Sequence, residues 1–452
     1  MDKEIQALMS GTVGFFWPIS DDGTFNQEPE RGFISKVDNG RLEIRTLNED
    51  AQASLLFPHQ RTRPHAIVCV FPEGSGVVLN ISRHGGTTNI GGRKASAFEY
   101  GARTVITRFP IEELDRKVVN VRVKELSAHF PGISKWAGLK VSEVKRERKP
   151  DGRARTATVH LQSPQQIVAD LGSLTLVIGG HWEVAENDDR PLIYAPVSIG
   201  VKAKRARDVS EMITVLLRVQ GLVNVAHDSF MAVDGGRAIL GAEDDPAQYP
   251  RFWNDALMEG PPSRGKRKGS TGFPLFTLAD LNGALGVSRW VRLYDKYPSA
   301  FDAVVSPYRF NGMTWHGYMR DTAVGIERLI AQCKKESRPA WANEKPQSLA
   351  LAKRVGSPFG EFVGDVSVWA SLFWGVYNGV KHQASYDPDP RDVATLALSG
   401  NLLLTAYLLQ RCGMSKMALD RILNKRVGYQ LRDRVRELVQ NPPKNLMPKS
   451  SY

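Results

Sequence analysis

The chain has 452 residues, of which 42% are hydrophobic, and its 60 Lys and Arg against 48 Asp and Glu give a formal net charge of +12. A single hydrophobic core usually stops growing at roughly 250–300 residues, so we expect at least two domains. The basic excess favours a polyanionic partner, above all nucleic acid. The three cysteines, Cys69, Cys333 and Cys412, are isolated in the sequence, which argues against a disulfide framework and a zinc ribbon.

Targeting and cofactor signals are the next feature of the sequence. No uninterrupted apolar run approaches the ~18 residues that cross a bilayer, and the N-terminal Met-Asp-Lys-Glu-Ile lacks the basic-then-apolar order of a signal peptide. These features favour a cytoplasmic protein with no membrane partner. The sequence contains no P-loop, dinucleotide fingerprint or H-E-x-x-H pattern, and we expect neither a cofactor nor a metal.

Short β-type segments separated by turn residues dominate the first 200 residues. Gly32 to Val37 leads through Asp38-Asn39-Gly40 into Arg41 to Arg45, and the Asn-Gly turn between two alternating segments predicts a β-hairpin. Ile111 to Leu114 is expected to form a short helical turn, and Ala128 to Leu139 an irregular segment. So many short strands indicate an antiparallel sandwich or barrel-like fold. The other predicted strands are Ala66 to Phe71, Gly76 to Ile81, Ser96 to Ile106, Val118 to Lys124, Ala157 to Leu161, Leu174 to Ile178 and Ile193 to Val201.

Helical periodicity first appears at residues 207 to 229, where Asp208-Val209-Ser210 is a plausible N-terminal cap and apolar residues recur at three- and four-residue steps. This predicts an amphipathic helix packed on the sheet. Residues 261 to 275 are basic and rich in Gly and Pro, which predicts a loop at a domain boundary. We therefore expect a β-rich domain over residues 1–260 and a helical domain over residues 276–452.

Beyond this loop the apolar pattern is helical almost throughout, which predicts a helical bundle. The longest apolar stripe runs through one helix from Phe359 to His382. The other predicted helices are Asp280 to Leu285, Thr314 to Lys334, Ser348 to Val355, Pro390 to Cys412, Ser415 to Asn424 and Gln430 to Gln440.

The end of the longest helix carries the most informative residues of the chain, Tyr377-Asn378-Gly379-Val380-Lys381-His382. An amide and an imidazole stand one helical turn apart where the helix ends. Such a histidine can act on a molecule outside the fold, although many histidines at helix ends only interact favourably with the negative end of the helix dipole. Tyr377 adjoins the apolar stripe, and core packing is an alternative role for it.

The helical half resembles the HEPN (higher eukaryotes and prokaryotes nucleotide-binding) superfamily, and in particular the ApeA-like bacterial abortive-infection proteins. The resemblance rests on the helix with Arg320 and Ile326-Glu327-Arg328-Leu329, on Tyr377 to His382, and on Leu402 to Leu409 followed by Cys412-Gly413-Met414-Ser415. The first half is similar to the ApeA N-terminal region in Gly14-Phe15-Phe16-Trp17-Pro18, the hairpin from Gly32 to Ile44, Val121 to Gly138 and Met212 to Phe230. The resemblance implies an α+β multidomain protein, with a sandwich-like antiparallel N-terminal domain followed by an all-α HEPN bundle.

Membership would imply a metal-independent endoribonuclease that acts as a homodimer, with two motif copies forming one composite site. Active HEPN enzymes place an Arg, usually followed by a polar residue, four to six residues before a His. In this sequence Asn378 and His382 match, but Tyr377 stands where the Arg is expected. Tyrosine carries no positive charge, so the charge that stabilises the phosphorane is either absent or comes from another residue. Lys381, Arg320, Arg328 and Arg354 are the candidates, among which the sequence does not choose.

Three basic clusters are candidates for contact with the RNA backbone, although each alone also fits a solvated loop. The first contains Lys145, Arg146 and Arg148, the second contains Lys204 and Arg205, and the third contains Lys266 and Arg267.

We therefore expect an anti-phage RNase of the ApeA type that cuts RNA, with tRNA as the substrate that the family suggests and a phage component as its trigger. The β-rich domain would sense infection or hold the RNA. One alternative is a catalytically degenerate HEPN protein that binds RNA or serves as a dimeric scaffold, as Tyr377 allows. Another is a sugar- or ligand-binding β-sandwich fused to a helical dimerisation domain, which an aromatic-lined cleft on the N-terminal domain would favour.

Overall fold

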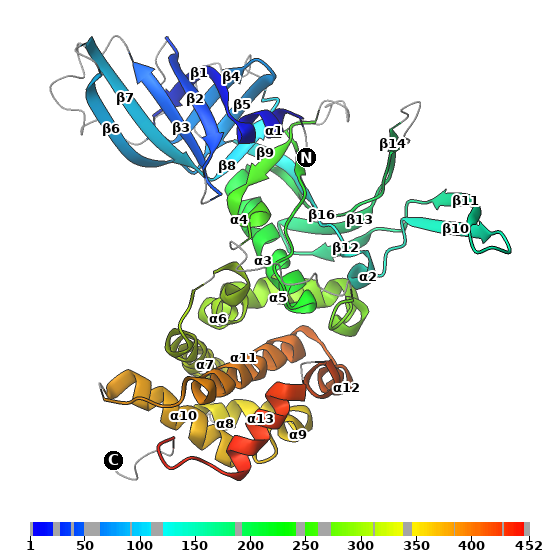
Figure 1. Cartoon of the computed structure of the whole chain (residues 1–452), viewed down its shortest axis with the longest axis vertical. Helices are drawn as coiled ribbons and strands as arrows, with labels where there is room; N and C mark the ends of the chain where they lie inside the picture. Colours follow the sequence, from blue (N-terminus) through cyan, green and yellow to red (C-terminus); the bar gives the residue numbers. More distant parts are fainter. Residues whose placement is uncertain are drawn as a thin grey trace.

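The structure is a computed structural model of the whole chain (Figure 1). It describes residues 3–20, 28–37, 40–48, 64–90, 93–109, 121–185, 192–240, 249–260, 273–310, 312–337, 346–383, 385–426 and 429–446. The predicted helical turn from Ile111 to Leu114 lies outside the described residues, as do residues 261–272 of the predicted boundary loop.

The first sheet is antiparallel and nine-stranded, in the order β18-β8-β5-β4-β1-β2-β3-β7-β6, and it curves into a half-barrel (Figure 1). The predicted hairpin is confirmed, because Gly32 pairs with Thr46 and Ile34 with Ile44. The inner face of this sheet packs on α1 (Lys3–Ser10). The helix contributes Ile5 and Leu8 to a core that also contains Phe16, Phe98 and Trp253. The strands are β1 (Thr12–Ile19), β2 (Glu30–Lys36), β3 (Leu42–Asn48), β4 (Ala66–Phe71), β5 (Gly74–Leu79), β6 (Ser82–Ile90), β7 (Arg93–Ala102), β8 (Thr104–Thr107) and β18 (Phe252–Asn254).

The second sheet is antiparallel and five-stranded, in the order β12-β13-β16-β9-β17. Its strands are β9 (Arg122–His129), β12 (Ile167–Asp170), β13 (Leu174–Gly180), β16 (Val197–Asp208) and β17 (Gly236–Ile239). The segment predicted to be irregular therefore begins within a strand, since β9 continues to His129, and it also holds the short helix α2 (Ser134–Ala137). The helix expected near residues 207–229 is confirmed as α3 (Val209–His227), and the Asp208 side chain caps it by accepting from the Ser210 amide at 2.7 Å.

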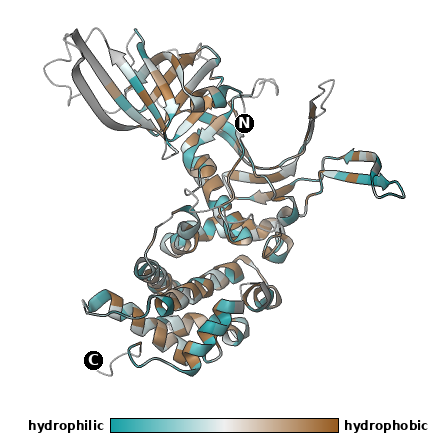
Figure 2. Cartoon of the chain, viewed as in Figure 1, coloured by the Kyte–Doolittle hydropathy of each residue, from teal (hydrophilic) through white to brown (hydrophobic). Residues whose placement is uncertain are grey.

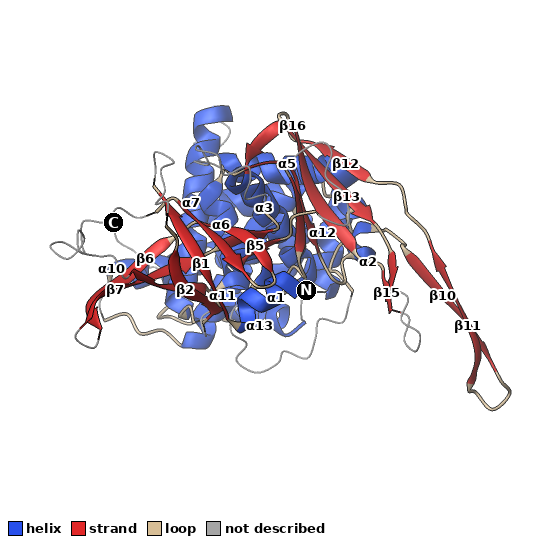
Figure 3. Ribbon diagram, turned by 90° about the horizontal axis from the view of Figure 1, so that it is seen from above, coloured by secondary structure: helices blue, strands red, loops and turns tan. Residues whose placement is uncertain are grey.

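Two hairpins extend from this part of the chain. One is β10 (Ser142–Arg148) with β11 (Ala154–Leu161), and the other is β14 (Glu183–Ala185) with β15 (Leu192–Tyr194). Figures 1 and 3 both show β10 and β11 projecting away from the rest of the molecule. Most of the side chains on these two strands are exposed. The hydropathy colouring of this hairpin in Figure 2 is correspondingly mixed, without a continuous apolar face.

The C-terminal part is a helical bundle, as predicted, with three differences. The expected helix from Phe359 to His382 is two helices, α9 (Ser357–Val363) and α10 (Val366–His382), because Gly364 adopts a φ of +87° between them. The short helix expected at Asp280 to Leu285 is replaced by α5 (Gly283–Lys296), and α6 (Pro298–Arg309), which the sequence did not predict, follows it. The remaining helices are α4 (Asp255–Met258), α7 (Trp315–Ser337), α8 (Gln347–Val355), α11 (Pro390–Cys412), α12 (Lys416–Asp420) with a π-helical turn (Arg421–Arg426), and α13 (Tyr429–Gln440).

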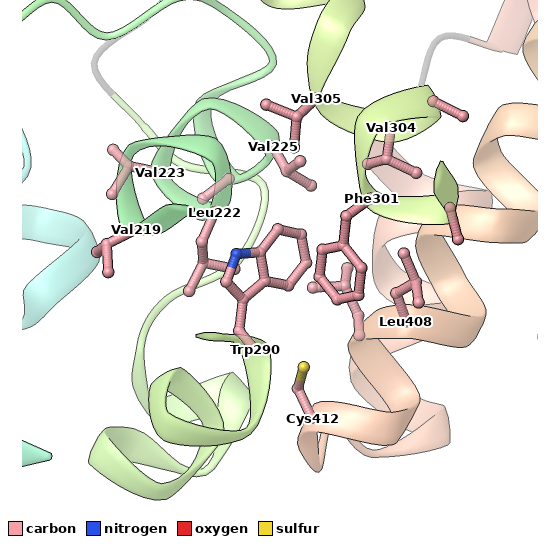
Figure 4. Close-up of a cluster of buried hydrophobic side chains, with 14 of the residues drawn as sticks. Val219, Leu222, Val223, Val225, Trp290, Phe301, Val304, Val305, Leu408 and Cys412 are labelled. Atoms are coloured by element: carbon pink, nitrogen blue, oxygen red, sulfur yellow. The ribbon is translucent and has the colours of Figure 1, made fainter. Parts of the chain in front are cut away.

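One continuous core joins the second sheet, α3 and the bundle. Figure 4 shows the indole of Trp290 on α5 among Leu222 and Val225 of α3 and Phe301 of α6. The Trp290 and Phe301 rings meet edge to face at 4.6 Å, and the indole Nε1 donates to the Arg218 carbonyl at 2.9 Å. Buried aromatic residues of this kind dominate core energetics, so the β-rich part and the helical part are packed together as a unit.

Two helices, α3 and α11, are long and apolar enough to cross a membrane by length and composition, although neither contains an uninterrupted apolar run of that length. In the folded chain 72% of the apolar window of each helix is buried. Packing inside the protein therefore accounts for their apolar sequence.

Candidate functional site

The candidate site lies at the C-terminal end of α10. Asp365 caps the start of the helix, because its carboxylate accepts from the Ser367 and Val368 amides. At the other end the Gln383 amide donates to the Gly379 carbonyl. The predicted apolar stripe of the helix is buried in the bundle, with Trp369, Phe373 and Val376 fully covered. This packing fixes which face of the last turn is left to solvent.

Asn378 and His382 lie on that solvent face. Both are exposed, and their spacing of four residues places them one turn apart on the same side of α10. Lys381, beside them, is exposed as well. The structure thus brings together an imidazole, an amide and an ammonium group at a helix end, where the partial negative charge of the dipole favours the cations.

Tyr377 points the other way, into the bundle. Its side chain is only 1% exposed, its ring lies 5.2 Å from that of Trp374, and its hydroxyl donates to Glu327 Oε2 on α7 at 3.1 Å. Burial raises the pKa of Tyr377, so the phenol stays protonated. The Lys381 ammonium lies 5.3 Å from the centre of the same ring. The residue at the motif's arginine position is therefore a packed, neutral donor.

Tyr386, from the segment that follows α10, packs on Gly379. A Cβ at position 379 would lie 2.6 Å from the Tyr386 ring, a distance that only glycine avoids. Burial, with a smaller effect of Asp392, raises the pKa of Tyr386 to about 12, and its hydroxyl has no hydrogen-bond partner among the described residues. The glycine in the motif thus permits the chain to fold back over the end of α10.

The arginines considered as substitutes take separate positions. Arg328 Nη1 donates to Ser299 Oγ on α6 at 2.8 Å, and the exposed Arg320 lies 3.4 Å from Asp321. Arg354 is half-buried on α8. Of the four candidate cations, Lys381 alone shares the last turn of α10 with Asn378 and His382.

Two further residues shape the site, although the sequence gave neither of them a role in it. Glu327 holds the Tyr377 hydroxyl, and Tyr386 covers Gly379. The small residue at position 379 was a signal that another chain segment approaches closely, whereas nothing in the spacing of α7 singled out Glu327.

The basic clusters lie on the β-rich part. Lys145, Arg146 and Arg148 are exposed on β10. Lys204 and Arg205 are exposed in a bulge of β16, where residues 203–206 lie opposite the single residue Lys124 of β9. Lys266 and Arg267 lie outside the described residues. Within the described ranges, no group of three or more His, Cys, Asp or Glu side chains is arranged to hold a metal.

Comparison with protein families gives two matches. The family model ApeA N-terminal domain 1 matches residues 12–290, and the model Apea-like HEPN matches residues 314–417, a range that contains α10 and its motif. Searches of curated proteins and of solved structures return no match. The first model spans more than half of the 452 residues and the second covers α7 to α11, which include the exposed histidine, so this chain belongs to the ApeA family and contains an ApeA-like HEPN domain.

Proposed function

We propose that this protein is an anti-phage abortive-infection protein that works in the cytoplasm as a metal-independent endoribonuclease, with His382 and Asn378 at its catalytic centre. The observation that carries the proposal is the exposure of both side chains on one face at the end of α10, within the HEPN match. An imidazole can both accept and donate a proton, as general acid-base chemistry requires.

The proposed reaction uses the RNA's own 2′-hydroxyl as nucleophile. The 2′-oxygen attacks the adjacent phosphorus and loses its proton, while the P–O5′ bond breaks and the departing 5′-oxygen gains a proton. The products are a 2′,3′-cyclic phosphate and a 5′-hydroxyl. His382 transfers one of these protons, Asn378 holds the phosphate by a hydrogen bond, and the Lys381 ammonium offsets charge on the phosphorane. A homodimer would bring two copies of the motif into one composite site.

The exposed cations of the β-rich part support an RNA-holding role in this proposal. Lys145, Arg146 and Arg148 project with the β10–β11 hairpin, and Lys204 and Arg205 bulge from β16. Cations that line a nucleic-acid path bind phosphates without reading sequence. A tRNA is the substrate class we propose, with a phage component as the trigger.

The test is RNA cleavage by the purified full-length protein in EDTA, alongside His382→Ala and the control Asn441→Ala, an exposed residue beyond α13. The parent and the control should cut RNA, and His382→Ala should not. A phage-infected lysate is tested in parallel to supply a trigger. Failure of the parent to cut in both conditions contradicts the proposal.

One observation favours a second function, a degenerate HEPN scaffold that binds RNA without cutting it. Active relatives carry a cation where this chain has Tyr377, which is buried and hydrogen-bonded to Glu327. The structure describes every residue in the last turn of α10, and Lys381 is the one permanent cation among them. Tyr377→Arg separates the two functions, because it restores the cation that active relatives carry at this position. A rate gain of about a hundredfold fits a catalytic site that lacks one charged donor. If neither the parent nor Tyr377→Arg cuts RNA, the result fits the scaffold function.

A further inference from the structure

Two cavities at the junction of the two sheets share His129 and Arg237. The larger is about 360 Å³, and its walls come from α1, β9, β15, β17 and β18, with Tyr194, Asp234 and Arg251 among the lining residues. The smaller, about 180 Å³, is lined also by His181, Ser198 and the Glu125–Lys202 ion pair. None of these residues belongs to the α10 site. Ligand sites of proteins commonly measure roughly 300–1,000 Å³, so the larger cavity suits a small molecule.

Two arginines face each other in the wall of the larger cavity. Arg237 of β17 and Arg251 form an antiparallel bridge, which places them directly opposite one another. Opposite residues in such a pair have Cβ atoms about 4.5–5.5 Å apart, and like charges there are destabilising. Arg237 Nε is buried and has no hydrogen-bond partner among the described residues. An anion in the cavity would supply an acceptor for this Nε and would offset the repulsion between the two charges.

The imidazoles beside the arginines provide hydrogen bonds rather than charge. Ser198 Oγ lies 2.8 Å from His129 Nδ1 and 3.2 Å from His181 Nδ1, so one hydroxyl bridges both rings. Burial, followed by the charges of His181, Arg237 and Arg251, lowers the pKa of His129 to about 3, and the ring is neutral at physiological pH. The Tyr194 ring stands edge-on to His129 at 6.2 Å and forms an aromatic side of the cavity.

Two carboxylates line the cavities. Asp234 lines the larger cavity but is exposed, where water screens its charge. Glu125 lines the smaller cavity and is paired with Lys202 at 3.0 Å. A dianion held by two guanidinium groups is a strong and geometrically specific arrangement, because each guanidinium can donate two parallel hydrogen bonds.

We propose that the larger cavity is a binding site for a small molecule that carries a phosphate monoester, with the phosphate between Arg237 and Arg251 and the rest of the ligand against Tyr194. The site is separate from the proposed ribonuclease centre. It lies where α1, both sheets and β15 meet, so an occupied cavity links elements that are far apart in the sequence.

Calorimetric titration of the full-length protein at constant ionic strength tests the proposal, with inorganic phosphate, AMP and adenosine as probes. Phosphate and AMP should bind, and adenosine, which lacks the phosphate, should bind at least about tenfold more weakly than AMP. Arg237→Gln should weaken AMP and phosphate binding about tenfold or more, and Arg237→Lys should fall between, since it keeps the charge but loses the fork. The control Arg292→Gln removes an exposed arginine on α5 and should leave binding unchanged.

Thermal unfolding without ligand shows whether the Arg237→Gln variant is folded. Arg237→Gln removes the like-charge opposition, so its Tm should equal or exceed that of the parent. The proposal is overturned if phosphate and AMP bind no better than chloride and adenosine, or if a folded Arg237→Gln binds AMP as tightly as the parent. Binding of an RNA oligonucleotide in this cavity without binding of phosphate or AMP also overturns it.

Discussion

The hydroxyl of Tyr377 on α10 donates a hydrogen bond to Glu327 on α7 at 3.1 Å, which ties the motif's first position to a neighbouring helix. The contact is partly covered, because Tyr377 is 1% exposed and Glu327 is half-buried. The residues of the motif from Tyr377 to His382 fall into two groups. Tyr377 and Gly379 fix the helix end within the fold, and Asn378, Lys381 and His382 face solvent.

Tyr377→Phe should lower the free energy of unfolding by about 1–3 kcal/mol, because the Glu327 carboxylate loses its donor in a half-buried place. Urea unfolding of the two proteins measures the difference. Tyr386→Phe is the matched control, since its hydroxyl is buried without a partner among the described residues, and its removal should cost little or even stabilise. Equal losses in the two variants would contradict the role given to the Tyr377–Glu327 bond.

Gly379→Ala should destabilise the protein, although alanine is favoured over glycine inside helices by roughly 1 kcal/mol. The added Cβ would lie 2.6 Å from the Tyr386 ring, and such overpacking costs about 1–3 kcal/mol. Gly360→Ala on α9 is the control, because its Cβ would meet Val366 at an ordinary 3.8 Å, and it should stabilise. In a Tyr386→Ala background the clash is gone, and Gly379→Ala should then stabilise too. A destabilisation that persists there would refute this explanation.

These helices also show what the sequence could predict and what it could not. The ends of α11 and α8 follow from caps and apolar spacing alone, and their predicted bounds agree with the structure to within one residue. The break between α9 and α10 was missed because the apolar stripe continues through Gly364, whose positive φ leaves no trace in hydrophobic spacing. Asn378 and His382 were predicted to stand one helical turn apart at the helix end, and both are exposed there. The Glu327 contact and the His129 cavity were not predicted, since their residues meet only through tertiary packing from separate elements.

His129 should make the protein less stable as the pH falls. Its pKa is about 3 in the folded chain against an ordinary 6.5, so between these values the unfolded chain binds a proton that the folded chain does not. Its contribution is fully present above pH 6.5 and is lost on acidification, by at most about 1.4 kcal/mol per pH unit. Urea unfolding from about pH 7 to about pH 4.5 should show a shallower pH slope for His129→Asn, while His160→Asn, an exposed histidine on β11, should keep the parent's slope. An unchanged slope in His129→Asn would argue against a buried neutral imidazole.

The β10–β11 hairpin should contribute to RNA affinity without contributing to stability. Replacing Lys145, Arg146 and Arg148 with Gln should weaken RNA binding and reduce the salt dependence, by about 0.7–0.9 in the slope of log K against log salt for each phosphate that the variant no longer neutralises. The Tm should not change, because all three side chains are exposed. A charge-matched control replaces three cations that are exposed elsewhere, Arg292, Lys353 and Lys444. If both triple variants lose the same RNA affinity, the loss comes from the lower overall charge of the protein and not from the hairpin.

The chemistry of the cut RNA ends tests the central claim most directly. A substrate RNA is incubated with the full-length protein in EDTA, with phage-infected lysate as the trigger where needed, and the product ends are identified by mass spectrometry. The account predicts 2′,3′-cyclic phosphate and 5′-hydroxyl ends that are present with the parent and with Asn441→Ala, absent with His382→Ala, and absent when the 2′-hydroxyl at the cut site is replaced by hydrogen. Cuts by His382→Ala at the parent's rate, or products with 5′-phosphate ends, would contradict it.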